Sequence, residues 1–491
     1  MRLSTALTNA KNLLIDEQNY SEIPDVMAYG DIYHQWDRGY MKMLENAILA
    51  GDCRPTHTEI VDYPKSAISV RPLARFSARD RIIYDALVFQ IAPSIDKTIH
   101  QSVHSYRWNH KRELPIFWFG PWKRMRRLAL STLRRDPSLR MASVDVSSFY
   151  EHIDVDILGD DLQCMTRDPA ATQNLQNFLT RFQGINHSWG LPQGPVASGI
   201  LANLYLAPID GFLARNKFRF LRYSDDMMIF DSDWTNLRDV VVEVNSILRS
   251  RRLAIASHKT AIRDPEDAVD LVHDIRRASI QHSVDVGLPG AQADVRALFD
   301  EVTKSEGPQS GSLRFAINRL AKLRDDYAVA WCLENLIFVP HMAKEIFGYL
   351  GAMRTSQSTI QRQLALFMDR SDSKSYPFIE QRILRYFLTM RIESNKLKDF
   401  AWEILEDKNR EDFSREFAGR YIGRNASVRE AQLLRHQFQE EPGLGMRRAL
   451  LASLHESGNL STRYLNEVEA SFPDLIWVCR FLRSDPLIPL P

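Results

Sequence analysis

Two acidic clusters, each at the end of a short apolar run, constrain this 491-residue chain more than any other feature. Asp145 ends the run Ala142-Ser-Val144, and Asp225 with Asp226 follows Phe220-Leu-Arg-Tyr-Ser224. A strand that stops at a charged residue can present it to a cleft, but a buried acid pair without a partner is costly. Two divalent cations about 3.5–4 Å apart would remove that cost. The alternative is an ordinary acidic hairpin turn, since Asp is a favoured turn residue.

The apolar pattern around these acids predicts their local structure. Apolar residues alternate with others over 218–223, and the chain returns as an apolar run over 227–230. This pattern indicates a half-buried hairpin whose tip carries the acids. Phe149 and Ile153 follow Asp145 at helical spacing, which places Asp145 at a strand-to-helix junction.

Further motifs accompany the acids in a fixed order. Downstream of Asp145 lie Gly190-Leu-Pro-Gln-Gly-Pro-Val-Ala-Ser198, Tyr223-Ser-Asp-Asp226 and Leu253-Ala-Ile-Ala-Ser-His-Lys-Thr260, and upstream lie Pro64-Lys-Ser-Ala-Ile-Ser-Val-Arg-Pro-Leu73 and Ser77-Ala-Arg-Asp-Arg81. Together they resemble palm motifs A to D and the fingers segments of reverse transcriptases, over roughly residues 60 to 262. The fingers segments are similar to those of group II intron and retron enzymes.

The resemblance implies a two-metal polymerase site. Asp145 and Asp225 would bind two Mg²⁺ ions, with Mn²⁺ as an alternative, and Asp226 would contribute less directly. The backbone carbonyl of Val146 is a further expected ligand, because Mg²⁺ prefers near-octahedral oxygen coordination. Lys259 follows a strand-like run, Leu253-Ala-Ile255. It would donate a proton to the leaving pyrophosphate, since lysine keeps its proton at neutral pH. A solvated surface lysine is the alternative.

The same resemblance implies how the nucleotide is bound. Lys65 and Arg71 would grip the triphosphate, with Arg71 offering a bidentate fork. Tyr150 would stack under the sugar and collide with a 2′-hydroxyl, which predicts selection of deoxynucleotides. An ordinary core aromatic is the alternative for Tyr150. Gln193 and Gly194 form a turn expected beneath the nascent base pair, directly before an apolar helix.

A basic and aromatic segment predicts contact with a nucleic-acid strand. Between Arg107 and Arg140 the chain carries ten basic residues and two acidic ones, interleaved with Trp and Phe, whereas the formal charge of the whole chain is only +1. Basic side chains follow phosphates and aromatic faces stack bases. A solvated helix face beside an aromatic core is the alternative. His104-Ser-Tyr-Arg107 also resembles the Ser-Tyr-Gly-Phe-Arg segment of group II intron enzymes, without its Gly-Phe. The candidate nucleic-acid contacts are Arg79, Arg81, Arg107, Lys123, Arg124, Arg126 and Arg127.

Composition favours an ordinary globular protein. With 44% hydrophobic and 25% charged residues, the chain can form two or three domains with proper cores. The four cysteines are widely separated and form no Cys-x-x-Cys motif, which favours reduced thiols in a cytosol. The start of the chain lacks the apolar stretch of a signal peptide, and we find no apolar run of about 18 residues. We therefore expect a cytoplasmic protein that does not use a membrane.

The second half departs from the common reverse transcriptase pattern. After Thr260 an acidic segment, 264–270, replaces the Phe-Leu-Gly primer-grip motif, so a standard thumb is not expected. Glycines and prolines over 284–312 predict turn and linker material around a short helix. From about residue 313, apolar stripes such as Ile317, Leu320 and Leu323 predict amphipathic helices of HEAT-like size, although without a clean internal period.

We therefore expect an α+β right-hand polymerase whose fingers and palm carry an antiparallel sheet, followed by an all-α HEAT-like repeat domain, with no standard thumb. The expected domains are an N-terminal helical extension at 1–60, fingers at 61–141, a palm at 142–265, a connector at 266–312 and helical repeats at 313–491. A palm followed by such helices resembles the abortive-infection and defence-associated reverse transcriptases of bacteria.

The leading hypothesis is an enzyme that adds dNTPs to a 3′-hydroxyl, RNA-templated or untemplated, in bacterial anti-phage defence. Its expected partners are dNTPs, an RNA template or non-coding RNA, the DNA product and further copies of the chain. Some relatives start synthesis on a protein tyrosine, and the helical half offers Tyr349, Tyr376, Tyr386, Tyr421 and Tyr464. One alternative is a retron or group II intron-like enzyme that copies a dedicated RNA. Another is a nucleic-acid-binding scaffold with a lapsed active site.

Overall fold

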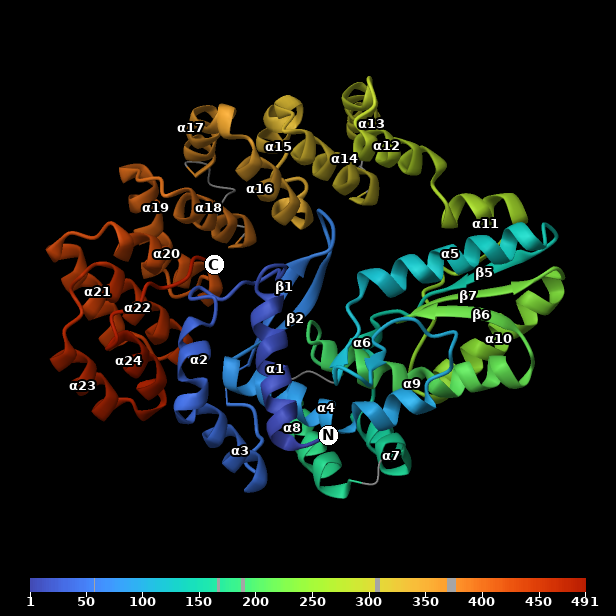
Figure 1. The fold of residues 1–491 in the computed structure, drawn as a ribbon, viewed down its shortest axis with the longest axis horizontal. Helices are drawn as coiled ribbons and strands as arrows, with labels where there is room; N and C mark the ends of the chain where they lie inside the picture. Colours follow the sequence, from blue (N-terminus) through green and yellow to red (C-terminus); the bar gives the residue numbers. More distant parts are fainter. Residues whose placement is uncertain (57, 166–167, 187–189, 305–309, 369–376) are drawn as a thin grey trace. The chain divides into compact units, whose positions relative to one another are not determined.

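The chain folds as two compact units, each built from segments that are far apart in the sequence (Figure 1). The computed structural model describes residues 1–491 except 57, 166–167, 187–189, 305–309 and 369–376. The first unit comprises Met1–Leu14, Met41–Val61 and Pro72–Ile275, and the second comprises Ile15–Tyr40, Asp62–Arg71 and Arg276–Pro491.

A four-stranded antiparallel sheet forms the centre of the first unit. Its strands are β5 (Arg140–Val144), β6 (Arg219–Tyr223), β7 (Asp226–Asp231) and β8 (Ala261–Arg263), in the order β6-β7-β5-β8. The order places the β6–β7 hairpin beside β5, with Val144 opposite Met227. The hairpin expected from the alternating apolar pattern is therefore present.

Helices cover both faces of this sheet (Figure 1). On one face lie α5 (Phe119–Arg135) and α11 (Pro265–Val272), and on the other lie α9 (Val196–Arg215) and α10 (Trp234–Ser250). Met141 and Phe230 pack with Leu133 of α5 and Ala268 of α11. Because side chains alternate along a strand, Ala142 and Ile229 point to the opposite face.

The rest of the first unit packs around a long buried helix, α4 (Ala78–Thr98), which begins at the N-cap Ser77. It contacts α8 and α9, and Tyr84 of α4 stacks on Phe178 of α8 with 5.0 Å between ring centroids. The other elements of the first unit are α3 (Met41–Leu49), α6 (Phe149–His152), α7 (Val155–Met165), α8 (Pro169–Asn186) and the β3–β4 ladder (Trp108–Asn109, Leu114–Pro115). Residues of α1 (Leu3–Glu17) and of the β1–β2 hairpin (Thr58–Pro64, Val70–Phe76) are divided between the two units.

The second unit is helical. Its helices are α2 (Gly30–Gln35), α12 (Ile275–Val286), α13 (Ala291–Lys304), α14 (Ser310–Leu323), α15 (Val329–Glu334), α16 (Ala343–Ala352), α17 (Gln357–Met368), α18 (Pro377–Met390), α19 (Asn395–Glu406), α20 (Asp412–Arg424), α21 (Val428–Glu440), α22 (Leu444–Glu456), α23 (Thr462–Ser471) and α24 (Ile476–Leu482). Contacts run from α14 to α16, α18, α20 and α22 in turn, and from α15 to α17 and α19. The helices thus form two rows that share one apolar core.

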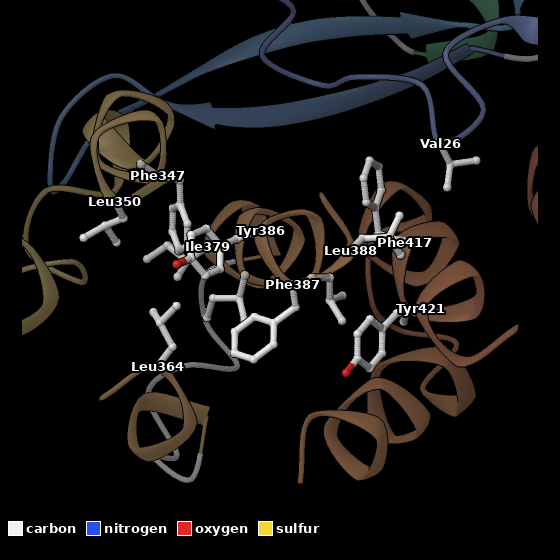
Figure 2. Packing of buried hydrophobic residues seen from close by; sticks show 14 of the residues in the cluster. Val26, Phe347, Leu350, Leu364, Ile379, Tyr386, Phe387, Leu388, Phe417 and Tyr421 are labelled. Atoms are coloured by element: carbon white, nitrogen blue, oxygen red, sulfur yellow. The ribbon is translucent and has the colours of Figure 1, made fainter. Parts of the chain in front are cut away.

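Figure 2 shows that core around α18, where Ile379, Tyr386 and Phe387 meet side chains of the neighbouring helices. Val26, from the N-terminal part of the chain, belongs to the same cluster. An N-terminal segment is therefore built into the helical unit, which no local pattern in the sequence predicts.

Two parts of the chain differ from the structure expected of them. Turn material around a short helix was expected over 284–312, and α13 lies there after a break, whereas no helix was predicted over 266–283, where the structure has α11 and most of α12. Gly287 and Gly290 fall in a single break between two helices, with positive φ at both. The strand-like run Leu253-Ala-Ile255 forms only an isolated bridge, from Ile255 to Val146, and the strand β8 follows it. The run is too short to form a ladder of its own.

Helix α9 has the length and apolar composition of a membrane span, but 72% of its apolar window is buried inside the structure. It contacts α4 as well as β6 of the sheet. This location explains why the sequence Val196–Arg215 is apolar on nearly all sides.

Candidate active site

The register of the sheet brings the two acidic clusters together at one end. Val144 pairs with Met227, so Asp145 lies opposite Asp226 one step further along the ladder. Tyr223 pairs with Asp226, which leaves Ser224 and Asp225 as the two-residue tip of the β6–β7 hairpin. Alternation puts Asp145 and Asp226 on the same face as Met141 and Phe230. That face is covered by α5 and α11 at the other end of the strands.

The acids disturb one another's protonation. Burial, then the charge of Asp226 and that of Asp145, raise the pKa of Asp225 to about 7, although its own backbone N–H and the Ser224 hydroxyl oppose the shift. Burial and Asp145 also raise the pKa of Asp226, against the opposing charge of Lys259. Carboxylates held together at such a disadvantage are typical of functional sites.

Lys259 lies against the Asp145 carboxylate as an ion pair, with 48% of its side chain exposed. Hydrogen bonding to Asp145 raises the pKa of Lys259, so the ammonium keeps its proton. The backbone fixes this arrangement, because Ala256 N donates to the Asp145 carbonyl at 2.7 Å and Lys259 N donates to the Ala256 carbonyl at 3.0 Å. Val146 is buried and forms an isolated bridge to Ile255. The hydrogen bonds of this bridge are made by the neighbouring Asp145 carbonyl and Ser147 N–H, so the Val146 carbonyl takes no part in it.

Tyr150 and the loop before α9 form one wall of the site. The Tyr150 hydroxyl lies 3.4 Å from Ser224 Oγ at the hairpin tip. The Tyr150 carbonyl accepts from Leu191 N at 2.8 Å, and a Cβ on Gly190 would lie 2.0 Å from that carbonyl oxygen. Only glycine permits such a close approach of the loop to α6.

The Gln193-Gly194 turn is linked to both of its neighbours. Gln193 Nε2 donates to Glu151 Oε1 at 3.4 Å, and the Gln193 carbonyl accepts from Ala74 N of β2 at 2.9 Å. Gly194 has a φ of 118°, which favours glycine, and α9 begins directly after Pro195. The structure thus brings Asp145, Asp225, Asp226, Lys259, Tyr150 and this turn into one region of the first unit.

Residues 63–283 match the family model of reverse transcriptases, described as RNA-dependent DNA polymerases. This segment is a reverse transcriptase domain. It contains every motif described above, and it identifies the chain as an RNA-directed DNA polymerase that carries a helical unit besides the polymerase domain.

Individual relatives are distant. Protein YkfC of Escherichia coli is 23% identical over 337 residues, which is 66% of this chain and 76% of that protein. Two solved structures align over most of the chain: apo telomerase from Candida tropicalis, with a TM-score of 0.33, 11% identity and coverage of 75% and 73% of the two chains, and telomerase from Candida albicans in complex with a fragment of telomeric RNA, with a TM-score of 0.30, 12% identity and coverage of 74% and 70%. At these TM-scores the telomerase likeness supports no conclusion about this chain.

Sequence reasoning missed two residues of the reverse transcriptase domain that touch the hairpin region. Tyr106 has a φ of 48°, and a Cβ on Gly199 would lie 2.3 Å from its ring. Burial, followed by the effect of the neighbouring Tyr106, raises the pKa of Tyr150 far above its ordinary value. Ser105 accepts a hydrogen bond from Ser224 N at 2.7 Å. The likeness of His104-Ser-Tyr-Arg107 to a family segment was the only signal for either residue.

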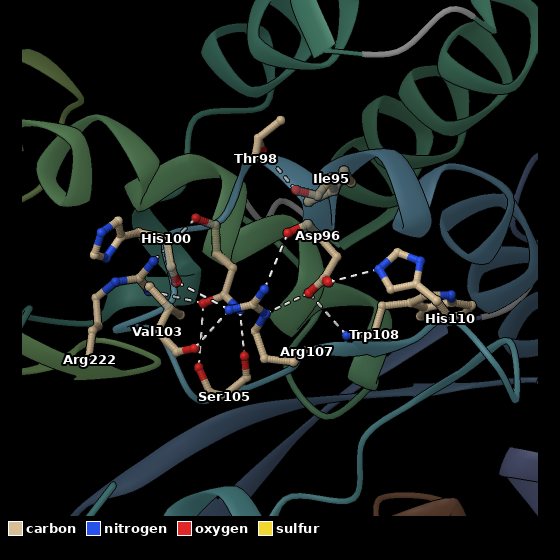
Figure 3. Close-up of polar contacts among 11 residues, drawn as sticks. Ile95, Asp96, Thr98, His100, Val103, Ser105, Arg107, Trp108, His110 and Arg222 are labelled. Atoms are coloured by element: carbon tan, nitrogen blue, oxygen red, sulfur yellow. Dashed lines mark hydrogen bonds and ion pairs between the residues drawn. The ribbon is translucent and has the colours of Figure 1, made fainter. Parts of the chain in front are cut away.

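Several of the basic residues expected to contact nucleic acid bind other parts of the domain instead. Arg107 donates to Asp96 Oδ1 at 2.6 Å and to three backbone carbonyls (Figure 3). Arg79 pairs with Asp80 at 2.8 Å, and Arg81 pairs with Asp85 at 2.8 Å. These contacts hold helix α4 and the loops at its two ends.

Helix α5 carries the other basic candidates. Arg126 donates to the carbonyls of Leu271 and Val272 at 3.1 and 2.5 Å, which ties α5 to α11. Lys123 Nζ lies 4.2 Å above the ring of Phe119. No acidic residue occurs within Phe119–Arg135, so Arg124 and Arg127 lie on a helix whose charged side chains are all basic.

Lys65 and Arg71 belong to the second unit, at the turn of the β1–β2 hairpin. Lys65 N donates to the Ser69 carbonyl at 2.8 Å, and the Arg71 guanidinium lies 5.1 Å from the centre of the Tyr63 ring. Both side chains are exposed.

Reverse transcriptase domains use divalent metal ions, and the acids at the hairpin fit that use. Carboxylate oxygens are the ligands that Mg²⁺ prefers, and the raised pKa values of Asp225 and Asp226, to which burial and Asp145 contribute in both cases, indicate a negative site that a cation would stabilise. Within the described ranges, no group of three or more Asp, Glu, His or Cys side chains already surrounds a point where an ion would lie. Lys259 holds the Asp145 carboxylate instead.

Proposed function

We propose that this reverse transcriptase domain adds dNTPs to a 3′-hydroxyl, with Asp145 and Asp225 as the principal ligands of two Mg²⁺ ions. The observation that supports this proposal is the convergence of three carboxylates at one end of the sheet, where burial and the neighbouring acids raise the pKa of Asp225 to about 7. Asp226 and the carbonyl of Val146 would complete the ligand set, with Mn²⁺ as an alternative ion. Bound there, the ions would stabilise charge on the attacking and leaving oxygens.

Lys259 would act as the proton donor to the leaving pyrophosphate. Its position beside Asp145 supports this role, because the raised pKa keeps the ammonium protonated before the reaction. The side chain is half exposed and is therefore free to move from the carboxylate to a phosphate oxygen.

The proposed nucleotide contacts follow from the motifs of the family. Lys65 and Arg71 would neutralise the triphosphate, as exposed cations on a hairpin turn. Tyr150 would exclude a 2′-hydroxyl, and its link to Ser224 supports a place beside the metal ligands. Gln193 and Gly194 would lie under the new base pair, since their turn is held between α6 and β2.

The proposed path for a nucleic-acid strand follows α5. Phe117, Trp118, Phe119 and Trp122 are exposed by 56%, 51%, 42% and 37%, which is unusual for four neighbouring aromatic residues. Trp118 O accepts from the Tyr223 hydroxyl at 3.0 Å, so this surface adjoins the hairpin. Exposed rings interleaved with cations suit a single strand. The proposed cations are Lys123, Arg124 and Arg127, with Arg79, Arg81, Arg107 and Arg126 acting mainly through the backbone they hold.

We also propose that this protein is one of the defence-associated reverse transcriptases of bacteria, that it acts in the cytoplasm and that it forms a homo-oligomer. In this proposal 61–141 are fingers, 142–265 a palm and 313–491 a HEAT-like repeat, with 1–60 as an extension, 266–312 as a connector and no standard thumb. The two rows of helices support the repeat. Anti-phage protection by the intact gene but not by an Asp225→Asn gene tests the role, and a structured RNA encoded beside the gene would favour the retron-like alternative.

Priming by a tyrosine of the helical unit has little support. Tyr349 and Tyr421 are almost fully buried, and their hydroxyls donate to the Asp325 and Ile392 carbonyls at 2.7 and 3.0 Å. Tyr386 and the Tyr464 hydroxyl are also buried, and Tyr376 lies outside the described residues. We therefore propose a nucleic-acid 3′-hydroxyl as the usual primer.

The deciding experiment is nucleotide incorporation by the purified protein, with its co-purifying nucleic acid retained and with Mg²⁺ and labelled dNTPs added. Sequencing the product separates copying from untemplated addition. Asp225→Asn should lower incorporation by at least about 10³-fold, because one ligand of both ions is lost. Incorporation at the wild-type rate by a folded Asp225→Asn protein would refute the site. The matched control is Asp231→Asn, at the other end of β7.

The sugar preference gives an independent test of Tyr150. Tyr150→Ala should raise the ratio of rNTP to dNTP incorporation by roughly 10- to 100-fold, because the collision with the 2′-hydroxyl would be removed. Tyr84→Phe is the control, since it removes a buried hydroxyl of the same domain away from the hairpin. An unchanged ratio in an active Tyr150→Ala enzyme would leave Tyr150 as a core aromatic.

A further inference from the structure

Ser224 sets the direction of the acidic turn, because it directly precedes Asp225 and has an unusual backbone conformation. Its φ is 57°, in the left-handed region. Residues other than glycine adopt this region only where their surroundings hold them there. The conformation of Ser224 therefore depends on the side chains that bind its peptide groups.

Two fully buried side chains bind the backbone of Ser224 from opposite sides. The Ser224 N–H donates to Ser105 Oγ at 2.7 Å, and the Ser224 carbonyl accepts from Arg222 Nη1 at 2.9 Å. Ser105 and Arg222 both have 0% exposure. Both peptide groups around Ser224 are thus held without help from solvent.

Arg222 is itself held by a carboxylate and an amide of helix α9. Its Nε and Nη2 donate to the two oxygens of Asp210 at 2.8 and 2.5 Å, and its Nη1 donates to Asn203 Oδ1 at 2.9 Å. A bidentate pair of this kind fixes the plane of the guanidinium. Asn203 Nδ2 also donates to the Ser105 carbonyl at 2.7 Å, so one network orients both residues that hold Ser224.

A loop along the free edge of β6 carries Ser105 to this position (Figure 3). Arg222 N donates to the Ser102 carbonyl, and His104 N donates to the Arg222 carbonyl, both at 2.9 Å. Arg107 closes the loop through Asp96 and through the carbonyls that it binds. The loop is therefore hydrogen-bonded to the backbone of Arg222, whose side chain binds the Ser224 carbonyl.

We propose that Ser105 and Arg222, supported by Asp210 and Asn203, are positioning residues that hold Ser224 in its left-handed conformation and so aim the Asp225 carboxylate at the metal site. They touch no reacting atom. The inference rests on the proposed function, because it takes Asp225 to be a metal ligand. It follows that loss of these contacts weakens metal binding and the chemical step while nucleotide affinity is retained.

Ser105→Ala is the mild test. The variant removes the acceptor for Ser224 N–H and the longer hydrogen bond, 3.4 Å, that Ser105 Oγ donates to Asn203 Oδ1. Loss of one strong hydrogen bond corresponds to about a tenfold change in an equilibrium or a rate. We expect the Mn²⁺ concentration that gives half of the maximal rise in unfolding temperature to increase by about that factor, kcat to fall by about the same factor, and KM for dNTP to stay within about twofold. The titration of the unfolding temperature requires no activity.

Arg222→Lys is the severe test, because lysine keeps the charge beside Asp210 but cannot make the fork to Asn203 and Ser224. Its effects on the Mn²⁺ titration and on kcat should exceed those of Ser105→Ala. Tyr205→Phe is the control. Tyr205 lies on α9, the helix that also carries Asn203 and Asp210. The variant removes a buried hydroxyl that does not bind the turn and that donates to the Arg251 carbonyl at 2.6 Å. It should lower stability and leave the Mn²⁺ titration unchanged.

The outcomes separate the two proposals. If folded Ser105→Ala titrates with Mn²⁺ as the wild type does and keeps its kcat, the positioning role is wrong. A loss of stability equal to that of Tyr205→Phe, with an unchanged titration, contradicts it as well. If the wild type binds Mn²⁺ but incorporates no nucleotide, the proposed function fails, and the titration still decides the role of Ser105. If Arg222→Lys does not fold, Ser105→Ala decides alone.

Discussion

In the second unit Asp25 and Asp31 are buried beside Arg448, whereas in the first unit Asp225 and Asp226 lie beside each other and Asp145. Arg448 donates to both carboxylates of the second unit, with distances of 2.7 Å to Asp25 Oδ2 and to Asp31 Oδ1. Burial alone would raise the pKa of Asp25, but the charge and hydrogen bonds of Arg448 lower it. At the hairpin, burial and neighbouring acids act in the same direction and raise the pKa of Asp225 to about 7.

The two regions differ in whether their carboxylates have a counterion nearby. In the helical unit a buried charge has its counterion within the same unit, so the carboxylates serve to hold the segment of Asp25 and Asp31 onto α22. At the hairpin the countercharge is incomplete, which leaves affinity for a cation from outside. Substitutions should therefore have opposite effects on stability at the two places.

The largest effect is expected from Arg448→Met, which leaves Asp25 and Asp31 buried without their countercharge. The loss should be about 3–5 kcal/mol in the free energy of unfolding of the helical unit. Arg463→Met is the control, because Arg463 pairs with Glu467 on the surface, at 91% and 59% exposure, and exposed pairs contribute about 0–1 kcal/mol. Urea unfolding followed by circular dichroism measures both. Equal losses would remove the contrast between the two units.

Lys259→Met removes the ammonium that pairs with Asp145 and lowers the pKa of Asp226. The acids at the hairpin would then have even less countercharge than those of the helical unit. We expect kcat to fall about 100-fold with little change in KM, because the proton donor is lost while substrate contacts remain. Steady-state incorporation measures this. Lys42→Met, which breaks an exposed pair with Glu45 in the same unit, is the control. A KM effect alone would point to a role in binding only.

Asp225→Asn should stabilise the metal-free protein, in a way that depends on pH. Because the pKa of folded Asp225 is about 7 and its ordinary value is 3.8, the favourable contribution of this residue is complete below pH 3.8 and is lost as pH rises through about 7. Above pH 7 we expect the variant to be more stable by about 1–2 kcal/mol, less than the full shift implies because the side chain keeps some contact with water.

Thermal unfolding with a metal chelator, from pH 4 to pH 8, measures this difference between Asp225→Asn and the wild type. The gap should widen with pH and should shrink when Mg²⁺ is added to both proteins. An Asp25→Asn variant is the counterpart from the helical unit, and it should be less stable than the wild type at neutral pH. A wild type that is more stable than Asp225→Asn at pH 8 without metal would show that the hairpin acids are compensated after all.

The smallest effect is expected at the capping box of α21, a paired acid near the surface. The Ser427 backbone and hydroxyl, with Lys398, lower the pKa of Glu430 to about 2, although burial raises it. Its stabilisation is present above the ordinary value of 4.5 and is lost as pH falls through about 2. Glu430→Gln should cost only about 0.5 kcal/mol at neutral pH, and its stability should change less than that of the wild type between pH 5 and pH 2. Identical acid profiles would contradict this.

Much of the local structure at the site was predictable. The β6–β7 hairpin, the junction at Asp145 and the start of α9 after Pro195 follow from alternation, helical spacing and turn residues that lie within about ten positions of one another. The strand expected at 253–255 was not found, because three residues make too weak a pattern. The break at Gly287 and Gly290 and the short helix α13 after it were expected, whereas α11 and α12 were missed, because a segment with an acidic start and glycines after it resembles a connector when its neighbours are unknown.

The contacts that hold the hairpin could not be predicted in this way. Ser105 and Ser224 are 119 positions apart, and Ser105 and Asn203 are 98 positions apart. No periodic pattern connects such residues, since each one is polar and would ordinarily be expected at the surface. The same holds for Arg448, which lies 423 positions from Asp25.

The order of the motifs, and the presence of three aspartates where strands end, were determined by the sequence itself, because strand length and turn position are local properties. The tertiary structure decided which acids remain without a full countercharge. Asp25 and Asp225 both lie near apolar residues in the sequence, and neither has a basic residue directly beside it. Only the folded chain places Arg448 beside Asp25 and adds Asp145 to the Asp225-Asp226 pair, since the energy of a buried charge depends on neighbours that the fold brings from elsewhere.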